Sequence, residues 1–389
     1  MGGNAVVVGG GIGGLAAAMG LRRIGWVVTV VERSPALDDA GAGISLHANG
    51  LRALDVLGVG DAVREAAMPQ YTGGTRVPGG GWLSRMDGAA LERTLGTPIV
   101  GIRRSVLHRL LRAALPPECL VTGAEVTTVD RSDPARVRVT VRDGVRDADL
   151  VVAADGVRST IRARLFPGHP GPAYSGSTVL RAITDGPVEL ASDFELTWGQ
   201  GAEFGHIALA DGRAEWHAVL GSPPGVRYPD ALAAMRERFA DWHDPIPALL
   251  DATRPDAVLH HDIHELVEPL PSFVAGRVAL LGDAAHAMTP NLGQGACQAL
   301  EDAATLAASL AAAPGIDAGL ARYDAERRPR SQAVARAARQ AGRLGGQLTH
   351  PLAVSVRNTV LRLAPSRVTL GAILRHADWT PPSLTPDAR

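Results

Sequence analysis

Residues 5–32 contain the sequence feature that most constrains the fold. A short apolar run is followed by Gly9, Gly11 and Gly14, then by a helix-forming segment and a second apolar run that closes at Glu32. In a G-x-G-x-x-G pattern the first glycine permits a tight turn, the second lets a pyrophosphate approach the backbone, and the third lets the helix pack against the strand. A carboxylate at position 32 suits a ribose 2′-hydroxyl and disfavours a 2′-phosphate. The segment therefore predicts a dinucleotide-binding β-α-β unit, without separating NAD from FAD.

In a second segment, a run of apolar residues is followed by an aspartate. The stretch "GRVALLGDAAHAMTPNLGQG" at residues 276–295 places Asp283 directly after that run, and Pro290, Gly293 and Gly295 follow. A carboxylate at the carboxyl end of a strand lies where α/β sheets bind ligands. The alternative is an ordinary strand–loop–helix connection in which Asp283 only caps a helix.

The order of elements predicts an α/β fold with two interleaved domains, because 389 residues are too many for one ordinary core. The β-α-β unit is followed by alternating, strand-like segments, including a hairpin signal at Asp211-Gly212, and then by another strand and helices. We expect a discontinuous nucleotide-binding domain at residues 1–70, 98–170 and 270–330, a substrate domain with an antiparallel sheet at 71–97 and 171–269, and a C-terminal helical region at 331–389.

Composition excludes several classes of function. The 39 basic residues are balanced by 40 acidic ones, so no nucleic-acid footprint is expected. Every basic residue is arginine, which excludes lysine-dependent chemistry. The two cysteines, Cys119 and Cys297, lack the spacing of metal ligands and indicate a reduced, intracellular protein. No apolar stretch is long enough for a membrane span. Neighbouring histidines in "HHDIHE" (260–265) would point to opposite faces of a strand, so no metal site is predicted.

Four motifs resemble those of the class A flavoprotein monooxygenases, the family of para-hydroxybenzoate and salicylate hydroxylases. They are "GGGIGG" with Glu32, "GAGISLHANGLRALDVLGVGDAV" (41–63), "DLVVAADGVRSTIR" (149–162) and "GRVALLGDAAHAMTPNLGQGACQALEDA" (276–303). The resemblance covers most of residues 5–330 and is weakest at 171–255. It implies a Rossmann-type FAD-binding domain of the glutathione-reductase kind, with an inserted antiparallel-sheet substrate domain and C-terminal helices.

The resemblance also assigns residues to the cofactor. Asp283 would hold the ribityl chain, and the helix that begins near Ala296 would direct its N–H groups at the flavin's pyrimidine edge. An arginine before a hydrophobic helix reaches the flavin in this family; Arg104 aligns best, with Arg103 as the alternative. The full cofactor-binding set is Gly9, Gly11, Ile12, Gly13, Gly14, Glu32, Arg33, Gly43, Ile44, Arg104, Val126, Asp155, Gly156, Gly282, Asp283, Pro290, Gly293, Gln294, Gly295 and Ala296.

Three residues are candidates for a role at the reacting atoms. Pro290 would stiffen the loop beside the flavin carbon that binds oxygen. His47 replaces the apolar or aromatic residue expected there, and would touch the substrate or flavin unless it is a packed histidine. His206 is the candidate to orient or deprotonate a phenol, within a pocket wall drawn from Arg181, Trp198, Phe204, His206, Trp216 and His217. The alternative for each wall residue is simple packing.

By this resemblance the protein is a cytoplasmic FAD-dependent monooxygenase, a monomer or homodimer. It would use NAD(P)H and molecular oxygen to hydroxylate an aromatic or polycyclic small molecule through a flavin C4a-hydroperoxide, with water excluded from the site. Two alternatives stay open: an FAD-dependent epoxidase or reductase acting on an isoprenoid-like substrate, and a flavin-binding redox protein without turnover.

Overall fold

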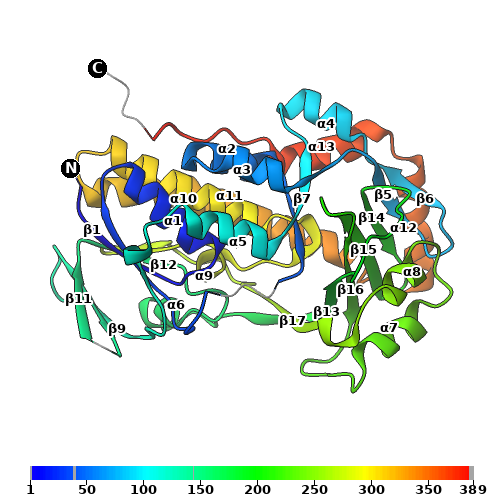
Figure 1. Cartoon of the computed structure of the whole chain (residues 1–389), viewed down its shortest axis with the longest axis horizontal. Coiled ribbons are helices and arrows are strands. Elements are labelled where there is room, and N and C mark those ends of the chain that lie inside the picture. Colours follow the sequence, from blue (N-terminus) through cyan, green and yellow to red (C-terminus); the bar gives the residue numbers. More distant parts are fainter. Residues whose placement is uncertain (1, 38–40, 143, 385–389) are drawn as a thin grey trace.

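A computed structural model describes residues 2–37, 41–142 and 144–384. Figure 1 shows two regions along the long axis of the molecule. One contains β1, β12 and the helices around them, and the other contains the strands from β13 to β17. The predicted α/β class is confirmed, and the separate second sheet is antiparallel except where β5 pairs in parallel with β14.

Six strands of the described residues form the sheet of the first region, in the order β18-β19-β12-β1-β2-β8. β1 pairs in parallel with β2 and β12, and β12 pairs in parallel with β19, so the carboxyl ends of these four strands share one edge. The strands are β1 (Asn4–Val8), β2 (Val27–Val31), β8 (Leu120–Val121), β12 (Leu150–Ala153), β18 (Val274–Ala275) and β19 (Val278–Leu280).

Small side chains let two helices pack closely beside this sheet. α1 (Ile12–Arg23) lies against α10 (Gly295–Ala312), where a Cβ on Gly20 would come 3.0 Å from the Cβ of Ala307. Most of α10 is buried, because α1, α2 (Ala48–Leu57) and α11 (Ile316–Leu344) pack around it. The continuous apolar runs of β1 and β12 fit strands that are covered on both faces.

The second region is a sheet of seven described strands, in the order β17-β13-β16-β15-β14-β5-β6. α7 (Ala231–Phe239) and α8 (Ile246–Asp251) cover one face, where Phe204 stacks on Trp216 with ring centroids 5.6 Å apart. The predicted hairpin at Asp211-Gly212 joins β15 and β16. The strands are β5 (Gly73–Arg76), β6 (Trp82–Arg85), β13 (Ala173–Ile183), β14 (Phe194–Trp198), β15 (Ala202–Ala208), β16 (Ala214–Gly221) and β17 (Leu259–Glu265).

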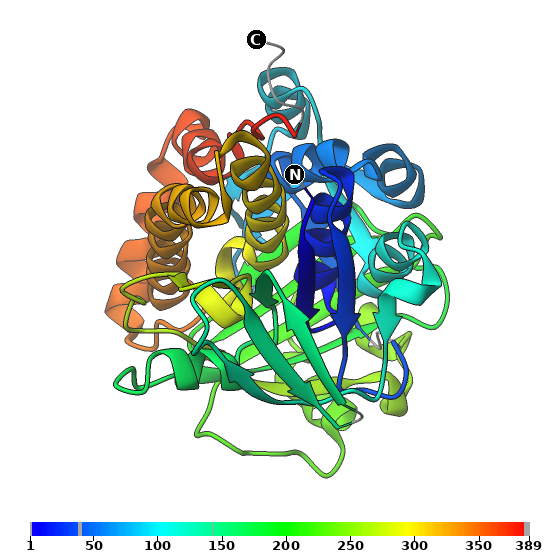
Figure 2. The same cartoon turned by 90° about the vertical axis from the view of Figure 1, so that its left-hand side faces the viewer.

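The described residues also form two three-stranded sheets and several further helices. Figure 2 shows the C-terminal helices (orange to red) along one side of the molecule. One sheet joins β3 (Gly43–Leu46), β7 (Ile99–Arg103) and β4 (Met68–Gln70), and the other joins β9 (Val126–Asp130), β10 (Val137–Val141) and β11 (Gly144–Ala148). The remaining α-helices are α3 (Gly60–Ala66), α4 (Gly88–Leu95), α5 (Arg104–Ala113), α6 (Thr160–Leu165), α9 (Asp283–His286), α12 (Pro351–Leu363) and α13 (Ser366–Ala377).

The proposed domain boundaries stay a prediction. The pairing of β5 with β14 puts residues 73–76 in the same sheet as the segment 173–265, which supports the assignment of 71–97 to the substrate domain. The boundary at residue 331 falls inside the continuous helix α11, so no chain break separates the two parts there.

Candidate active site

The first glycine loop has the shape that a dinucleotide requires. Gly9 has a φ of +109°, and a Cβ there would lie 2.3 Å from the carbonyl oxygen of Ala154. A Cβ on Gly14 would lie 1.9 Å from the carbonyl oxygen of Gly9, so both positions exclude a side chain. No atom lies within 4 Å of a Cβ built on Gly11, which precedes the first turn of α1 at Ile12 and Gly13. The loop is closed against the protein and open on the side where phosphates would approach.

Glu32 follows β2 and is tied to the same loop. Its carboxylate accepts hydrogen bonds from the backbone N–H of Gly10 at 2.7 Å and of Ser34 at 2.9 Å. The Glu32 carbonyl accepts from Ala124, which brings the start of β9 at Val126 to this end of the sheet. Arg33 is exposed beside it. A carboxylate has about four acceptor sites, so these two bonds leave capacity for a sugar hydroxyl.

Asp155 lies just beyond the carboxyl end of β12. One carboxylate oxygen accepts from the N–H groups of Thr160 and Ile161 at 2.9 and 3.2 Å, at the start of α6. The other oxygen is buried and has no hydrogen-bond partner. Gly156, with a φ of +80°, has open space around it. An unpartnered buried carboxylate oxygen facing an open glycine fits a ligand hydroxyl or amide donor.

Asp283 begins α9 beyond the end of β19, and its side chain is exposed. Gly282, with a φ of +61°, turns the chain there, and its N–H donates to the buried carboxylate of Asp302 at 2.9 Å. The buried Arg162 joins this loop to the Asp155 loop, because its guanidinium donates to the carbonyl oxygens of Ala284 and Val157. The two loops are thereby held in fixed relation.

The loop from Pro290 to Ala296 leads into α10. Pro290 is exposed at the start of a single 3₁₀ turn, and Gly293 leaves that turn with a φ of +62°. Gln294 is buried, with its side-chain oxygen accepting from Asn49 at 2.8 Å and its amide nitrogen unpartnered. Gly295 and the half-buried Ala296 open α10, and no atom lies within 4 Å of a Cβ on Gly295. The N-terminal end of α10 is therefore free to face a ligand.

His47 lies against this loop. Its Nε2 atom would be 3.3 Å from a Cβ on Gly293, and its Nδ1 atom is buried without a partner. Burial, together with the nearby His376, lowers the pKa of His47 to about 4, so the imidazole is neutral near pH 7. Gly43 and the half-buried Ile44 precede it on β3, and the Arg104 side chain packs over Gly41. Arg103, the alternative to Arg104, forms an ion pair with Asp211.

Beneath the loop lies a buried ionic network that the sequence analysis missed. Arg327, 1% exposed, pairs with the fully buried carboxylates of Glu301 and Asp302. Burial alone would raise the pKa of Asp302, but His286 and Arg327 outweigh it and bring that pKa to about 2. Asn49 donates to Glu301 at 2.6 Å, which connects the network to Gln294. The network links α2, α9, α10 and α11 below the loop.

His206 does not lie where the sequence prediction requires. It is opposite Glu195 on β14 and Trp216 on β16, so its side chain shares the face that Phe204 and Trp216 turn toward α7 and α8. Its Nε2 atom lies 3.2 Å from the carbonyl oxygen of Ser192. Because side chains alternate along a strand, residues 203, 205 and 207 take the other face. The His206 side chain thus lies on the face turned away from β3, and its role at the reacting atoms stays a prediction.

The other face of the sheet turns toward β3. A Cβ on Gly43 would lie 2.8 Å from the Cβ of Glu215 and 3.0 Å from Ile207. His217 shares this face and its Nδ1 atom lies 3.3 Å from the Glu215 carboxylate. Arg181 is directly opposite His217 in the sheet, where facing Cβ atoms are typically about 5 Å apart.

These groups set the charge of the face. Burial alone would lower the pKa of His217, but the carboxylates of Glu215 and Glu203 outweigh it and raise that pKa. Burial raises the pKa of Glu203. This face therefore combines an arginine and a histidine with the carboxyl groups of Glu215 and Glu203. Of the sequence-proposed wall residues, Arg181, Trp198 and His217 lie on this face, whereas Phe204 and Trp216 lie on the other.

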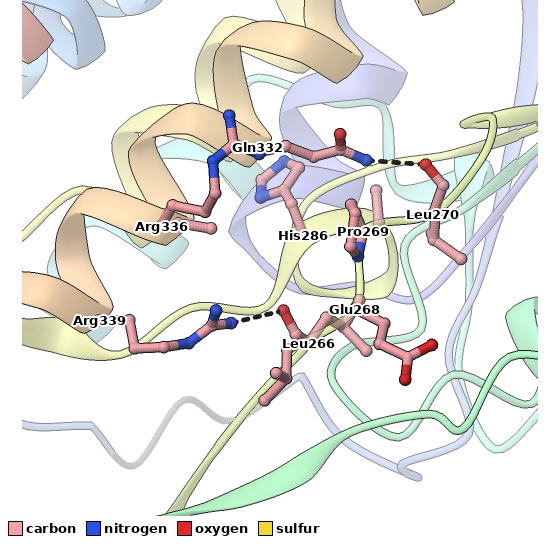
Figure 3. A pocket seen from close by; sticks show the side chains of 11 residues that line it. Leu266, Glu268, Pro269, Leu270, His286, Gln332, Arg336 and Arg339 are labelled. Carbon is pink, nitrogen blue, oxygen red and sulfur yellow. Dashed lines mark hydrogen bonds between the residues drawn. The ribbon is translucent and has the colours of Figure 1, made fainter.

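Two cavities border the region. One of about 470 Å³ is lined by Arg158, Arg162, His169 and His264, beside the Asp155 loop. The other, of about 40 Å³, lies between α11 and residues 266–270, where Gln332 and Arg339 donate to the carbonyl oxygens of Leu270 and Leu266 (Figure 3). The second holds no more than about one water molecule.

Residues 2–37, 41–142 and 144–384 contain neither a metal site nor a membrane-spanning helix. No group of three or more His, Cys, Asp or Glu side chains there is arranged to hold a metal ion. No helix in those ranges is long and apolar enough to cross a membrane.

Known proteins match this fold and sequence. A family described as an FAD binding domain matches residues 4–221 and 246–338. The chain is 38% identical over 379 residues to the aurachin C monooxygenase/isomerase of Stigmatella aurantiaca, covering 97% of this chain and 98% of that protein. It is 34% identical over 372 residues to the 2-heptyl-3-hydroxy-4(1H)-quinolone synthase of Pseudomonas aeruginosa, covering 93% and 94%. Klebsiella pneumoniae HpxO in complex with FAD and uric acid superposes with a TM-score of 0.90 at 27% identity, covering 96% of each chain.

The open glycine loop, the strand-end carboxylates and these matches define an FAD-dependent monooxygenase of class A. The chain belongs to the FAD binding domain family. The resemblance seen in the sequence is confirmed, and FAD is the cofactor.

Proposed function

We propose that the protein uses NAD(P)H and molecular oxygen to hydroxylate an aromatic ring that carries an ionisable O–H or N–H group. Quinolone and uric acid, in the names of two similar proteins, are nitrogen heterocycles with ring N–H and carbonyl groups. The observation that carries the substrate class is the pairing of Arg181 with His217 on the β3-facing side of the substrate sheet. A guanidinium there favours the anionic form of a ring oxygen, and the adjacent imidazole can donate a hydrogen bond to it.

The strand-end residues fit FAD, which when bound supplies the oxygen-transfer chemistry. The N–H groups at Gly11 and the start of α1 would bind the pyrophosphate, Glu32 the adenosine ribose and Asp283 the ribityl hydroxyls. Asp155 would offer its unpartnered oxygen to the cofactor. Further contacts are proposed for Ile12, Gly13, Arg33, Gly43, Ile44, Arg104, Val126, Gly156, Gly282, Pro290, Gly293, Gln294, Gly295 and Ala296.

His217 takes the role that the sequence assigned to His206. Its Nδ1 atom faces Glu215, which leaves Nε2 to donate a hydrogen bond to a substrate oxygen. Holding that oxygen as an anion raises the electron density of the ring and prepares it for an electrophilic oxygen atom. His47, neutral near pH 7, would contact the ring or the flavin beside Gly293.

The 470 Å³ cavity beside Asp155 is the proposed docking place of NAD(P)H. Arg158 is exposed at its wall, and His169 and His264 line it. Cationic side chains suit the pyrophosphate of the nucleotide. We further propose a cytoplasmic location and a monomeric or homodimeric state; the free, buried thiols of Cys119 and Cys297 support a reducing compartment.

Substrate-stimulated NAD(P)H oxidation under ¹⁸O₂ tests the proposal. We expect 4-hydroxyquinoline, or another ionisable phenol or quinolone, to stimulate oxidation and to gain one ¹⁸O atom, and its O-methyl ether to do neither. If the ether reacts as well as the free phenol or quinolone, the proposed substrate class is contradicted. If the product contains no ¹⁸O, the proposed hydroxylation is contradicted and a reductase is favoured.

A pair of variants tests the two histidines. His217→Gln should lower kcat/KM by about 100-fold, the lower range for acid–base groups, with the FAD content unchanged. His206→Gln, on the opposite face of the adjacent strand, should retain the product yield per NAD(P)H. The opposite result would assign the substrate-binding role to His206 instead of His217.

A further inference from the structure

The C-terminal helix α12 exposes an apolar stripe. Leu352, Val356, Val360 and Leu363 are 72%, 63%, 60% and 78% exposed. At 100° per residue they fall within an arc of about 80° and extend for about 17 Å along the helix. Single exposed apolar residues are ordinary, but a continuous stripe marks an interaction surface. Leu344 and Val368 continue the exposed apolar character before and after this helix.

A flank of α12 beside the stripe is anchored to the protein. Arg357 donates to the carbonyl oxygen of Gly345 at 2.7 Å, and its guanidinium lies 5.5 Å from the ring centroid of Trp198. Other contacts join α12 to β6. The stripe is therefore presented outward by a fixed helix. Figure 2 shows the orange and red helices, which include α12, on an outer side of the molecule.

Charge around the stripe has one sign. The segment 351–377, which contains α12 and α13, has four arginines and no aspartate or glutamate, whereas the whole chain has a net charge of −1. Arg336, Arg343, Arg362 and Arg375 are exposed. An apolar helix face bordered by arginines is the pattern of a helix that lies in the plane of an anionic membrane surface.

We propose that α12 and its arginines dock the protein on an anionic lipid surface. Charge favours this occupant over a second copy of the chain, because a two-fold interface would bring together two copies of helices that carry arginines and no carboxylate. Trp198 lies beneath α12 on the β3-facing side of the substrate sheet, so a membrane seated on the stripe would lie one helix away from the proposed substrate site. Lipid binding itself does not depend on the substrate class proposed above.

Vesicle flotation of the FAD-loaded protein tests the proposal. We expect it to float with phosphatidylcholine vesicles containing 30% phosphatidylglycerol, far less with pure phosphatidylcholine, and less again in 0.5 M NaCl. Equal flotation with both vesicle types, or none with either, would overturn the proposal.

Matched variants separate the contributions. Val356→Ser/Val360→Ser should lower the partition coefficient at least tenfold, and Arg362→Gln/Arg375→Gln by about fivefold per arginine. Val27→Ser/Val145→Ser removes two exposed valines elsewhere and should bind as the wild type does. Unchanged flavin absorbance verifies the fold of each variant. Wild-type-like flotation of the Val356→Ser/Val360→Ser variant would refute the assignment. A dimer, seen by light scattering, that this variant converts to monomers would assign the stripe to a self-interface instead.

Discussion

Replacement of Gly11 by alanine is expected to weaken FAD binding without unfolding the protein. Gly11 is the N-cap of α1 with a φ of −75° and a ψ of −179°, which alanine adopts without strain, and no protein atom lies within 4 Å of the new Cβ. Alanine restricts the unfolded chain and so adds about 0.4–1 kcal/mol of stability, but it is a poorer N-cap than glycine by a similar amount. The free energy of unfolding of the FAD-free protein should therefore change by less than about 1 kcal/mol.

The same methyl group would stand where the pyrophosphate approaches α1. Loss of one hydrogen bond to a charged group costs about 1.5–3 kcal/mol, which corresponds to a Kd for FAD that is about 10- to 150-fold higher. Gly14→Ala provides the contrast, because its Cβ would lie 1.9 Å from the carbonyl oxygen of Gly9. Relief of that contact moves α1 away from β1, which costs at least about 1–3 kcal/mol of folding stability before any ligand is added.

Two measurements on the FAD-free proteins distinguish these effects. Urea unfolding reports stability, and titration with FAD, followed by quenching of its fluorescence, reports affinity. Gly11→Ala should have an unfolding midpoint close to that of the wild type with a raised Kd, and Gly14→Ala a lowered midpoint. Wild-type affinity in Gly11→Ala would refute the proposed path of the pyrophosphate over this loop.

Three further predictions concern the surroundings of the site. Arg327→Met leaves Glu301 and Asp302 as buried, uncompensated charges and should lower the free energy of unfolding by about 3–5 kcal/mol in urea titrations; a loss below 1 kcal/mol would show that the network is not tightly coupled. Because the pKa of His47 is lowered to about 4, the unfolded chain binds a proton below about pH 6.5 that the folded protein excludes, so stability should fall as the pH decreases from 6.5 to 4; His47→Gln should remove part of that dependence, and an unchanged pH profile would contradict the burial of this imidazole. Arg158→Ala should raise the KM for NAD(P)H at least fivefold with an unchanged FAD content, and an unchanged KM would move the nucleotide away from the 470 Å³ cavity.

Local motifs were readable from the sequence because each depends on neighbouring residues. Gly9 and Gly14 exclude a side chain through contacts made within one β-α-β unit and the adjoining Ala154. The apolar run before Asp283 is short, buried and followed by a turn, which is typical of a central parallel strand. The expected Rossmann-type fold with FAD therefore followed from short segments and is confirmed.

The ionic network could not be read in the same way. Arg327 and Asp302 are 25 residues apart on two helices, and both carry charges that usually indicate solvent exposure. The sequence signal was the pair of carboxylates at residues 301 and 302 inside an otherwise uncharged helix. Their partner becomes evident only when α10 and α11 pack together.

The sequence by itself predicted the glycine loop of the β-α-β unit and the carboxylates at positions 32 and 283 that follow apolar runs, because each depends on neighbouring residues. The tertiary structure decided which histidine lies on the sheet face that is turned toward β3. His206 and His217 lie on adjacent antiparallel strands, and their side chains point to opposite faces of the sheet. The alternation of side chains along a strand predicts that the two faces differ, but it does not predict which face the helices cover. Only the approach of Gly43 to Glu215, 172 positions along the chain, turns the His217 face toward the first domain. A contact between such distant residues depends on the packing of whole domains, which no local pattern encodes.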